Sequence, residues 1–155
     1  MTDKKLATHE DAQLVLKLYE LRREETMRKA RDWFAFEFFP ETIEQINEVY
    51  STRGNHNAYL RMVTTYWDMA ASFCVQGALD ADLLLASGNE MIMVWAKLEK
   101  FVPDIRKVSG LDDYLKNIEQ VINMVDWAHD RVHWLQGRFA QFRQMSEQAK
   151  SAEGD

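Results

Sequence analysis

Proline and glycine are scarce in this sequence, and their scarcity restricts the fold more than any other feature. Only 2 prolines and 6 glycines occur among the 155 residues. Folds built from many short strands need such residues in their frequent turns. The sequence therefore predicts an all-α protein, an irregular helical bundle with long N-terminal and C-terminal helices and shorter helices between them. An apolar fraction of 46% is typical of one globular domain, so residues 1–155 are expected to form a single domain with frayed ends at 1–7 and 147–155.

The first and last helices are predicted from long stretches without a helix breaker. Thr8 is a suitable N-cap, and the next breaker along the chain is Pro40. This stretch of about 30 residues would measure ~45 Å as one helix. A second uninterrupted helix is expected over about residues 111–149.

Apolar residues at helical spacing predict the buried faces of the helices. The clearest stripe lies along residues 59–74, and another follows a predicted capping box at Ser87–Glu90. We expect the core to be centred on seven residues from these stripes and from the last helix, namely Tyr66, Trp67, Phe73, Trp95, Leu98, Val125 and Leu135.

Charge and the lack of long apolar runs exclude two classes of partner. The net charge of −6 repels a phosphate backbone, and the basic residues between Arg22 and Arg31 alternate with acidic ones. The longest apolar run, residues 91–96, is much shorter than the ~18 residues of a membrane span. We therefore expect no nucleic-acid and no membrane partner. The single Cys74 cannot form an internal disulfide, which favours a cytoplasmic protein.

A recognisable pattern lies within about residues 59–119. It consists of residues 73–84, Gly88, the step Trp95-Ala96-Lys97-Leu98 and Arg106. This pattern resembles an uncharacterised bacterial family of helical proteins, in which a helix ends at Gly, an aliphatic-Asp step starts a short Leu-rich helix, and a Trp-x-Lys-Leu helix leads to an Arg. The resemblance implies an all-helical module and no known activity. Relatives often carry membrane-spanning segments ahead of this region, and none is expected here.

One cluster has the spacing of metal ligands. Asp126 and His129, and again Asp130 and His133, repeat the carboxylate-x-x-His step of helical di-metal proteins. A bundle metal site needs ligands that point inward, whereas three of these residues, Asp126, Asp130 and His133, point away from the predicted apolar stripe. We therefore expect no metal and no cofactor, with these four residues as the candidates should a metal bind.

Catalytic chemistry is not favoured by any motif. Cys74 lies on an apolar stripe, and burial in apolar surroundings raises the pKa of a thiol and makes it unreactive. Gly77 and Gly88 stand alone and form no phosphate-binding loop. We therefore favour a protein that is not an enzyme.

Large aromatic residues are numerous, with 5 Trp, 8 Phe and 5 Tyr. At helical spacing such residues form a core, a protein interface or a small-molecule pocket. If a pocket or groove exists, we expect it to be lined by Trp33, Phe36, Phe38, Tyr66, Trp67 and Trp95.

A second apolar stripe lies near the start of the chain and consists of Leu14, Val15, Leu18 and Leu21. On a ~45 Å helix this stripe would lie too far from the core to be buried there. The stripe therefore predicts a homodimer interface, unless the C-terminal helix folds back onto it. The function expected is a non-enzymatic, self-associating protein-interaction or scaffolding module with a possible protein partner. The alternative is a bundle that binds a small apolar ligand or a metal.

Overall fold

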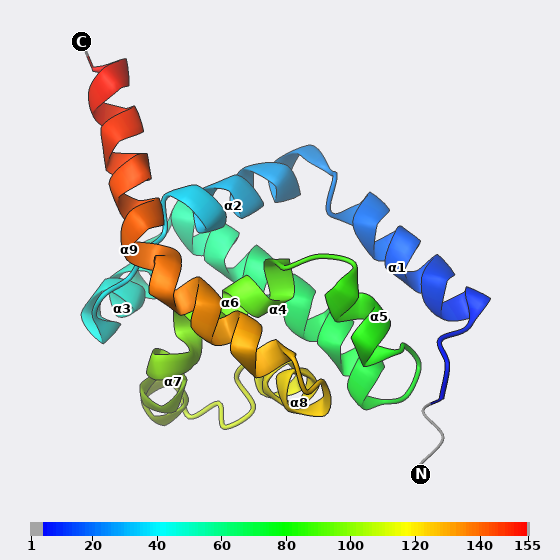
Figure 1. The fold of residues 1–155 in the computed structure, drawn as a ribbon. Helices are drawn as coiled ribbons and strands as arrows, with labels where there is room; N and C mark the ends of the chain where they lie inside the picture. Colours follow the sequence, from blue (N-terminus) through cyan, green and yellow to red (C-terminus); the bar gives the residue numbers. More distant parts are fainter. Residues whose placement is uncertain (1–4, 155) are drawn as a thin grey trace.

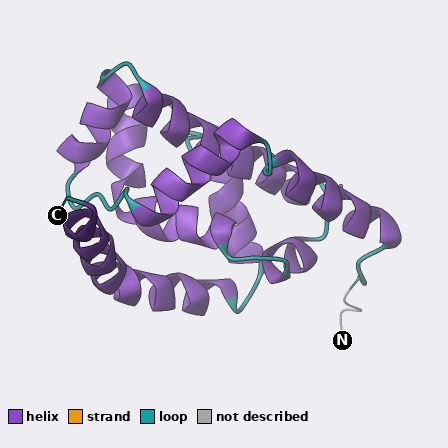
Figure 2. Ribbon diagram, turned by 90° about the horizontal axis from the view of Figure 1, so that it is seen from above, coloured by secondary structure: helices purple, strands orange, loops and turns teal. Residues whose placement is uncertain are grey.

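A computed structural model describes residues 5–154 of the chain (Figure 1). Within this part the chain forms helices and short connections and no β-strand, as Figure 2 shows, so the predicted all-α class is confirmed. None of these helices is both long and apolar enough to cross a lipid bilayer. In chain order the elements are α1 (His9–Leu21), α2 (Glu25–Phe36), α3 (Ile43–Ser51), α4 (Asn55–Val75), α5 (Ala81–Ala86), α6 (Glu90–Leu98), the 3-10 helix η1 (Glu99–Phe101), α7 (Val102–Ser109), α8 (Lys116–Met124) and α9 (Ala128–Glu153).

The helix α4 forms the centre of the bundle. It packs against α2, α3, α6 and α8, and its buried residues follow the three-and-four spacing expected for one helix face. Of the seven residues predicted to centre the core, Tyr66 and Phe73 are partly buried. The other five are buried, namely Trp67, Trp95, Leu98, Val125 and Leu135.

The predicted long first helix is wrong, because the chain turns between α1 and α2. The Glu24 carboxylate accepts hydrogen bonds from the backbone N–H groups of Thr26 and Met27, both at 2.9 Å, and so caps the start of α2. On the other side of the turn, Arg31 donates to the carbonyl oxygen of Arg22 at 3.0 Å and completes the end of α1. These side chains replace the backbone bonds that a continuous helix would make. Thr8 caps α1 as expected.

The predicted uninterrupted last helix is also wrong, because α8 and α9 are separated at Val125, which has an extended backbone. The buried residues keep one heptad spacing through this break, so the apolar pattern of the sequence does not reveal it: Ile118, Val121, Val125, Ala128, Val132 and Leu135. Asp68 of α4 fixes the start of α8 by accepting from the N–H of Ile118 at 3.1 Å and from the amide of Asn117 at 2.9 Å. Figure 1 shows that the last turns of α9 extend beyond the other helices.

Two further sequence predictions concern the chain ends and the capping box at Ser87–Glu90. Residues 147–153 are helical, and the expected fraying of residues 1–4 and 155 lies outside the described residues. The capping box is wrong, because Ser87 donates to the carbonyl oxygen of Leu84 and the carboxylate of Glu90 pairs with Arg31. The single-domain organisation stays a prediction.

Candidate functional site

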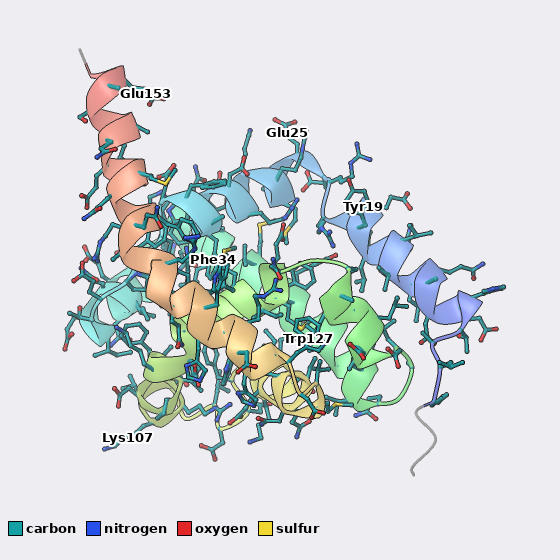
Figure 3. All side chains as sticks on the ribbon, viewed as in Figure 1. Tyr19, Glu25, Phe34, Lys107, Trp127 and Glu153 are labelled. Carbon is teal, nitrogen blue, oxygen red and sulfur yellow. The ribbon has the colours of Figure 1, made fainter. Side chains whose placement is uncertain are left out.

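An open groove of about 930 Å³ lies between α2, α6 and α9. Its floor includes Phe34 of α2, Val63 and Trp67 of α4 and Val94 of α6. Figure 3 shows Phe34 near the crossing of α2 and α9. Beyond this crossing the last turns of α9 diverge from the bundle, and their groove-facing side chains line one wall.

An ion pair fixes one end of the groove. The guanidinium of Arg31 contacts the carboxylate of Glu90, with Nε to Oε2 at 2.8 Å. This hydrogen bond to Glu90 raises the pKa of Arg31 above its usual value. The pair joins the middle of α2 to the first turn of α6, so it holds the floor and one wall of the groove together.

A buried lysine holds the end of α2 beside the groove. Lys97 of α6 is 4% exposed and donates to the carbonyl oxygens of Phe34, Ala35 and Phe38, the last two at 3.2 and 2.8 Å. Its ammonium group also lies 3.9 Å from the centre of the Phe39 ring. The carbonyls at a helix C-terminus lack intrahelical partners and carry partial negative charge. Lys97 therefore caps α2 from a neighbouring helix, while burial lowers the pKa of its ammonium group to about 7.

The outer part of the groove exposes large apolar side chains. Phe36 at the end of α2 is 67% exposed, and on α9 Trp134 and Met145 are 52% and 59% exposed. Phe142 and Ala149 of α9 continue this wall toward the tip of the helix. Contiguous exposed apolar surface of this kind is typical of binding sites.

The rim of the groove is more acidic than basic. Besides the Arg31 and Glu90 pair, its charged residues are Asp32 and Glu37 of α2 and Lys150 and Glu153 of α9. They flank an apolar strip with no titratable cluster on its floor. Within the described residues no group of three or more His, Cys, Asp or Glu side chains could hold a metal ion. An apolar strip with charged residues at its edges is an arrangement typical of binding sites.

The structure distributes the six predicted aromatic residues over separate places. Only Phe36 and Trp67 line the groove. Trp33 stacks on Phe38 at 4.7 Å between ring centroids and lies against His56. The two others also lie elsewhere: Trp95 is buried in the core, and the hydroxyl of Tyr66 donates to the carbonyl oxygen of Leu18.

The stripe on α1 lies against the bundle. Leu18 is 3% exposed, and Leu14 and Val15 pack against the core, whereas Leu21 is 47% exposed. The bend after α1 brings this stripe to the body of the protein, where α1 contacts α5. The reason given above for a dimer through α1 therefore no longer holds, and an interface at these residues stays a prediction.

The other candidate residues lie apart from the groove. Asp126, His129, Asp130 and His133 are all exposed, and His129 is 2.9 Å from the side-chain oxygen of Asn123. Cys74 is buried. Its burial raises the pKa of its thiol to about 12, as expected for an unreactive cysteine.

Sequence reasoning missed the α9 wall of the groove. Trp134, Phe142 and Met145 were not among the residues expected to line a groove. The signal was present, because Leu135, Phe142 and Ala149 recur at seven-residue spacing. The missing information was that α9 leaves the bundle before this stripe ends.

These observations define an all-helical domain with an open apolar groove. The sequence profile of the DUF4760 family, described as a domain of unknown function, matches residues 7–127. The chain belongs to this family, which confirms the resemblance to an uncharacterised helical family and widens the matched region. Neither the curated proteins nor the solved structures contain a significant match. The matched region ends one residue before α9, so one wall of the groove lies outside it.

Proposed function

We propose that the protein is a non-catalytic interaction module whose groove between α2, α6 and α9 receives a helix of a protein partner. The observation that carries this proposal is the apolar surface that Phe36 of α2 and Trp134, Phe142 and Met145 of α9 present along the groove. Aromatic residues and methionine are enriched at the centres of protein interfaces, and helices dock into grooves through apolar side chains at three-and-four spacing.

The shape of the site favours a protein partner over an enclosed ligand. Pockets for small molecules bury most of the ligand surface, whereas here Phe36, Trp134 and Met145 lie exposed at the open edge. The α9 wall from Trp134 to Glu153 is about 28 Å long at 1.5 Å per residue. This length accommodates several turns of a partner helix.

Site-specific photo-crosslinking tests the proposal. Benzoylphenylalanine replaces Phe36 in the chain produced in its natural host, and the matched control carries it at Leu16, an equally exposed position on α1 at 66%. We expect a protein adduct after irradiation from position 36 and none from position 16. Equal crosslinking at both positions, or none at either, contradicts the proposal.

A small amphiphilic ligand is a second candidate occupant of the groove, and one buried atom that is unpaired within the described part of the chain favours it. The indole Nε1 of Trp67 is buried and has no hydrogen-bond partner among the described residues, and Trp67 lies on the groove floor. A ligand with an oxygen acceptor on an apolar chain would satisfy this donor by displacing the side chains that cover it. Titration with a long-chain alkyl carboxylate should then change tryptophan fluorescence with one-to-one saturation, and Phe36→Asp should abolish the change. A signal that does not saturate argues against this candidate.

A further inference from the structure

We infer that the helix received by the groove is α9 of a second copy of this chain, in a two-fold arrangement that exchanges the ends of α9. This inference rests on the proposed function and names its partner. Each copy presents both halves of the contact, because the side of its α9 that carries Phe142, Met145 and Ala149 is also one wall of its own groove. A surface that is complementary to itself closes as an isologous dimer.

The side chains of α9 fix the register of the contact. When two copies of α9 pair in antiparallel directions about a centre between Met145 and Ser146, Phe142 of each copy faces Ala149 of the other. A large residue then meets a small one twice, which lets the helix backbones approach closely. Phe142, Met145, Ser146 and Ala149 all line the groove wall.

The same register pairs opposite charges. Arg138 of one copy faces Glu153 of the other, and the two-fold axis repeats this pair. Within the described residues neither side chain has an ion-pair partner; Arg138 lies over the Trp134 ring at 4.8 Å, and Glu153 is exposed on the last turn (Figure 3). Both groups are therefore available for the contact.

Length and charge also favour α9 as the element exchanged. The segment from residue 138 to residue 153 spans about 22 Å at 1.5 Å per residue, so in this register the tip of one α9 reaches the level of Arg138 on the other. The chain as a whole has a net charge of −6, whereas α9 contains four basic and three acidic residues. Two copies thus meet through a segment with little net charge, where like-charge repulsion is weak.

A charge-swap experiment on the 155-residue chain tests the inference. Light scattering coupled to size exclusion, over a dilution series, should give a species of about twice the chain mass of 18.2 kDa. The variants R138E and E153R each place like charges at two symmetric positions, so each should weaken the dimer by about tenfold. The double variant R138E with E153R should restore the parent affinity. The control E147R reverses an exposed charge outside the groove lining on the same helix and should leave the affinity unchanged.

The possible results separate this inference from the proposed function. A parent chain that stays at the single-chain mass at about 100 μM overturns the second copy as partner. Adducts of position 36 with a different protein would then still support the interaction module, whereas adducts at twice the chain mass support both. A dimer that is indifferent to the single reversals, or one that the double variant fails to restore, overturns the α9 exchange.

Discussion

We expect the protein to become more stable as the pH rises from 7 to 9, because the ammonium group of Lys97 is buried. Burial lowers the pKa of Lys97 from 10.5 to about 7 in the folded chain, while the unfolded chain keeps the ordinary value. Between these two values the unfolded state binds more protons than the folded state. Raising the pH therefore disfavours the unfolded state. Integrating this difference from pH 7 to pH 9 gives a gain of about 2 kcal/mol in the free energy of unfolding.

The assay compares how steeply the free energy of unfolding changes with pH in two proteins, rather than its value at one pH. Urea denaturation followed by far-UV circular dichroism gives the free energy of unfolding at pH 7, 8 and 9 for the parent and for Lys97→Met. The variant keeps the length of the side chain and removes the charge, so the difference in slope between the two proteins isolates this group. The thiol of Cys74 has a raised pKa and contributes a smaller opposite slope to both proteins.

A matched control and a refuting result complete this test. Lys100→Met changes an exposed lysine in the adjoining 3-10 helix and should leave the slope unchanged. If the parent and Lys97→Met show the same pH dependence, the ammonium group stays charged in the folded chain. The carbonyl oxygens of α2 would then outweigh the cost of burial, and the reasoning would be refuted.

Three further substitutions test the fold and the expectation that no metal binds near His133. Trp67→Ala should lower the free energy of unfolding by about 3–5 kcal/mol, because it leaves a cavity beside the groove floor; a melting temperature equal to that of the parent would contradict this. Asp68→Ala should cost about 1 kcal/mol, because it removes the cap of α8, and the urea midpoint should fall while the far-UV spectrum is kept. His133→Ala should change the stability by no more than about 0.5 kcal/mol, and elemental analysis of the parent should find no stoichiometric zinc or iron.

The sequence predicted helices better than it predicted where they bend. Thr8 and Asp80 are caps whose partners lie three residues along the chain, so local rules identify them. The bend before α2 depends on Arg31 reaching back to the carbonyl oxygen of Arg22. The start of α8 depends on Asp68, 50 residues earlier in the chain than Ile118. Such long-range caps are invisible to periodicity, which explains the two helices predicted as too long.

The groove was predicted only in part for a related reason. Aromatic residues at helical spacing look alike whether the face is covered by another helix or left open. Trp33 and Phe36 both lie on α2, yet Trp33 is buried under Phe38 and His56 while Phe36 is exposed. The difference arises because the chain after α2 and the start of α4 cover Trp33, whereas no helix within residues 5–154 covers Phe36, and no local pattern specifies either arrangement.

Lys97 and Arg106 belong to the pattern that resembles the family, and in this chain both hold backbone segments in place. Lys97 caps α2, and Arg106 donates to the carbonyl oxygen of Tyr114 at 2.8 and 3.0 Å to hold the turn before α8. Neither of them lines the groove. In this chain these residues therefore report the architecture rather than an activity.

The position of α9 outside the matched region separates two tasks along the chain. Residues 7–127 supply most of the turns and the core, whereas α9 adds Ala128, Val132 and Leu135 to the core and forms one wall of the groove with its outer turns. Substitutions in the outer turns of α9 do not disturb the packing of α4, because the buried residues of α9 end at Leu135. The outer turns of α9 are therefore free to change in sequence while the core beneath them keeps its packing.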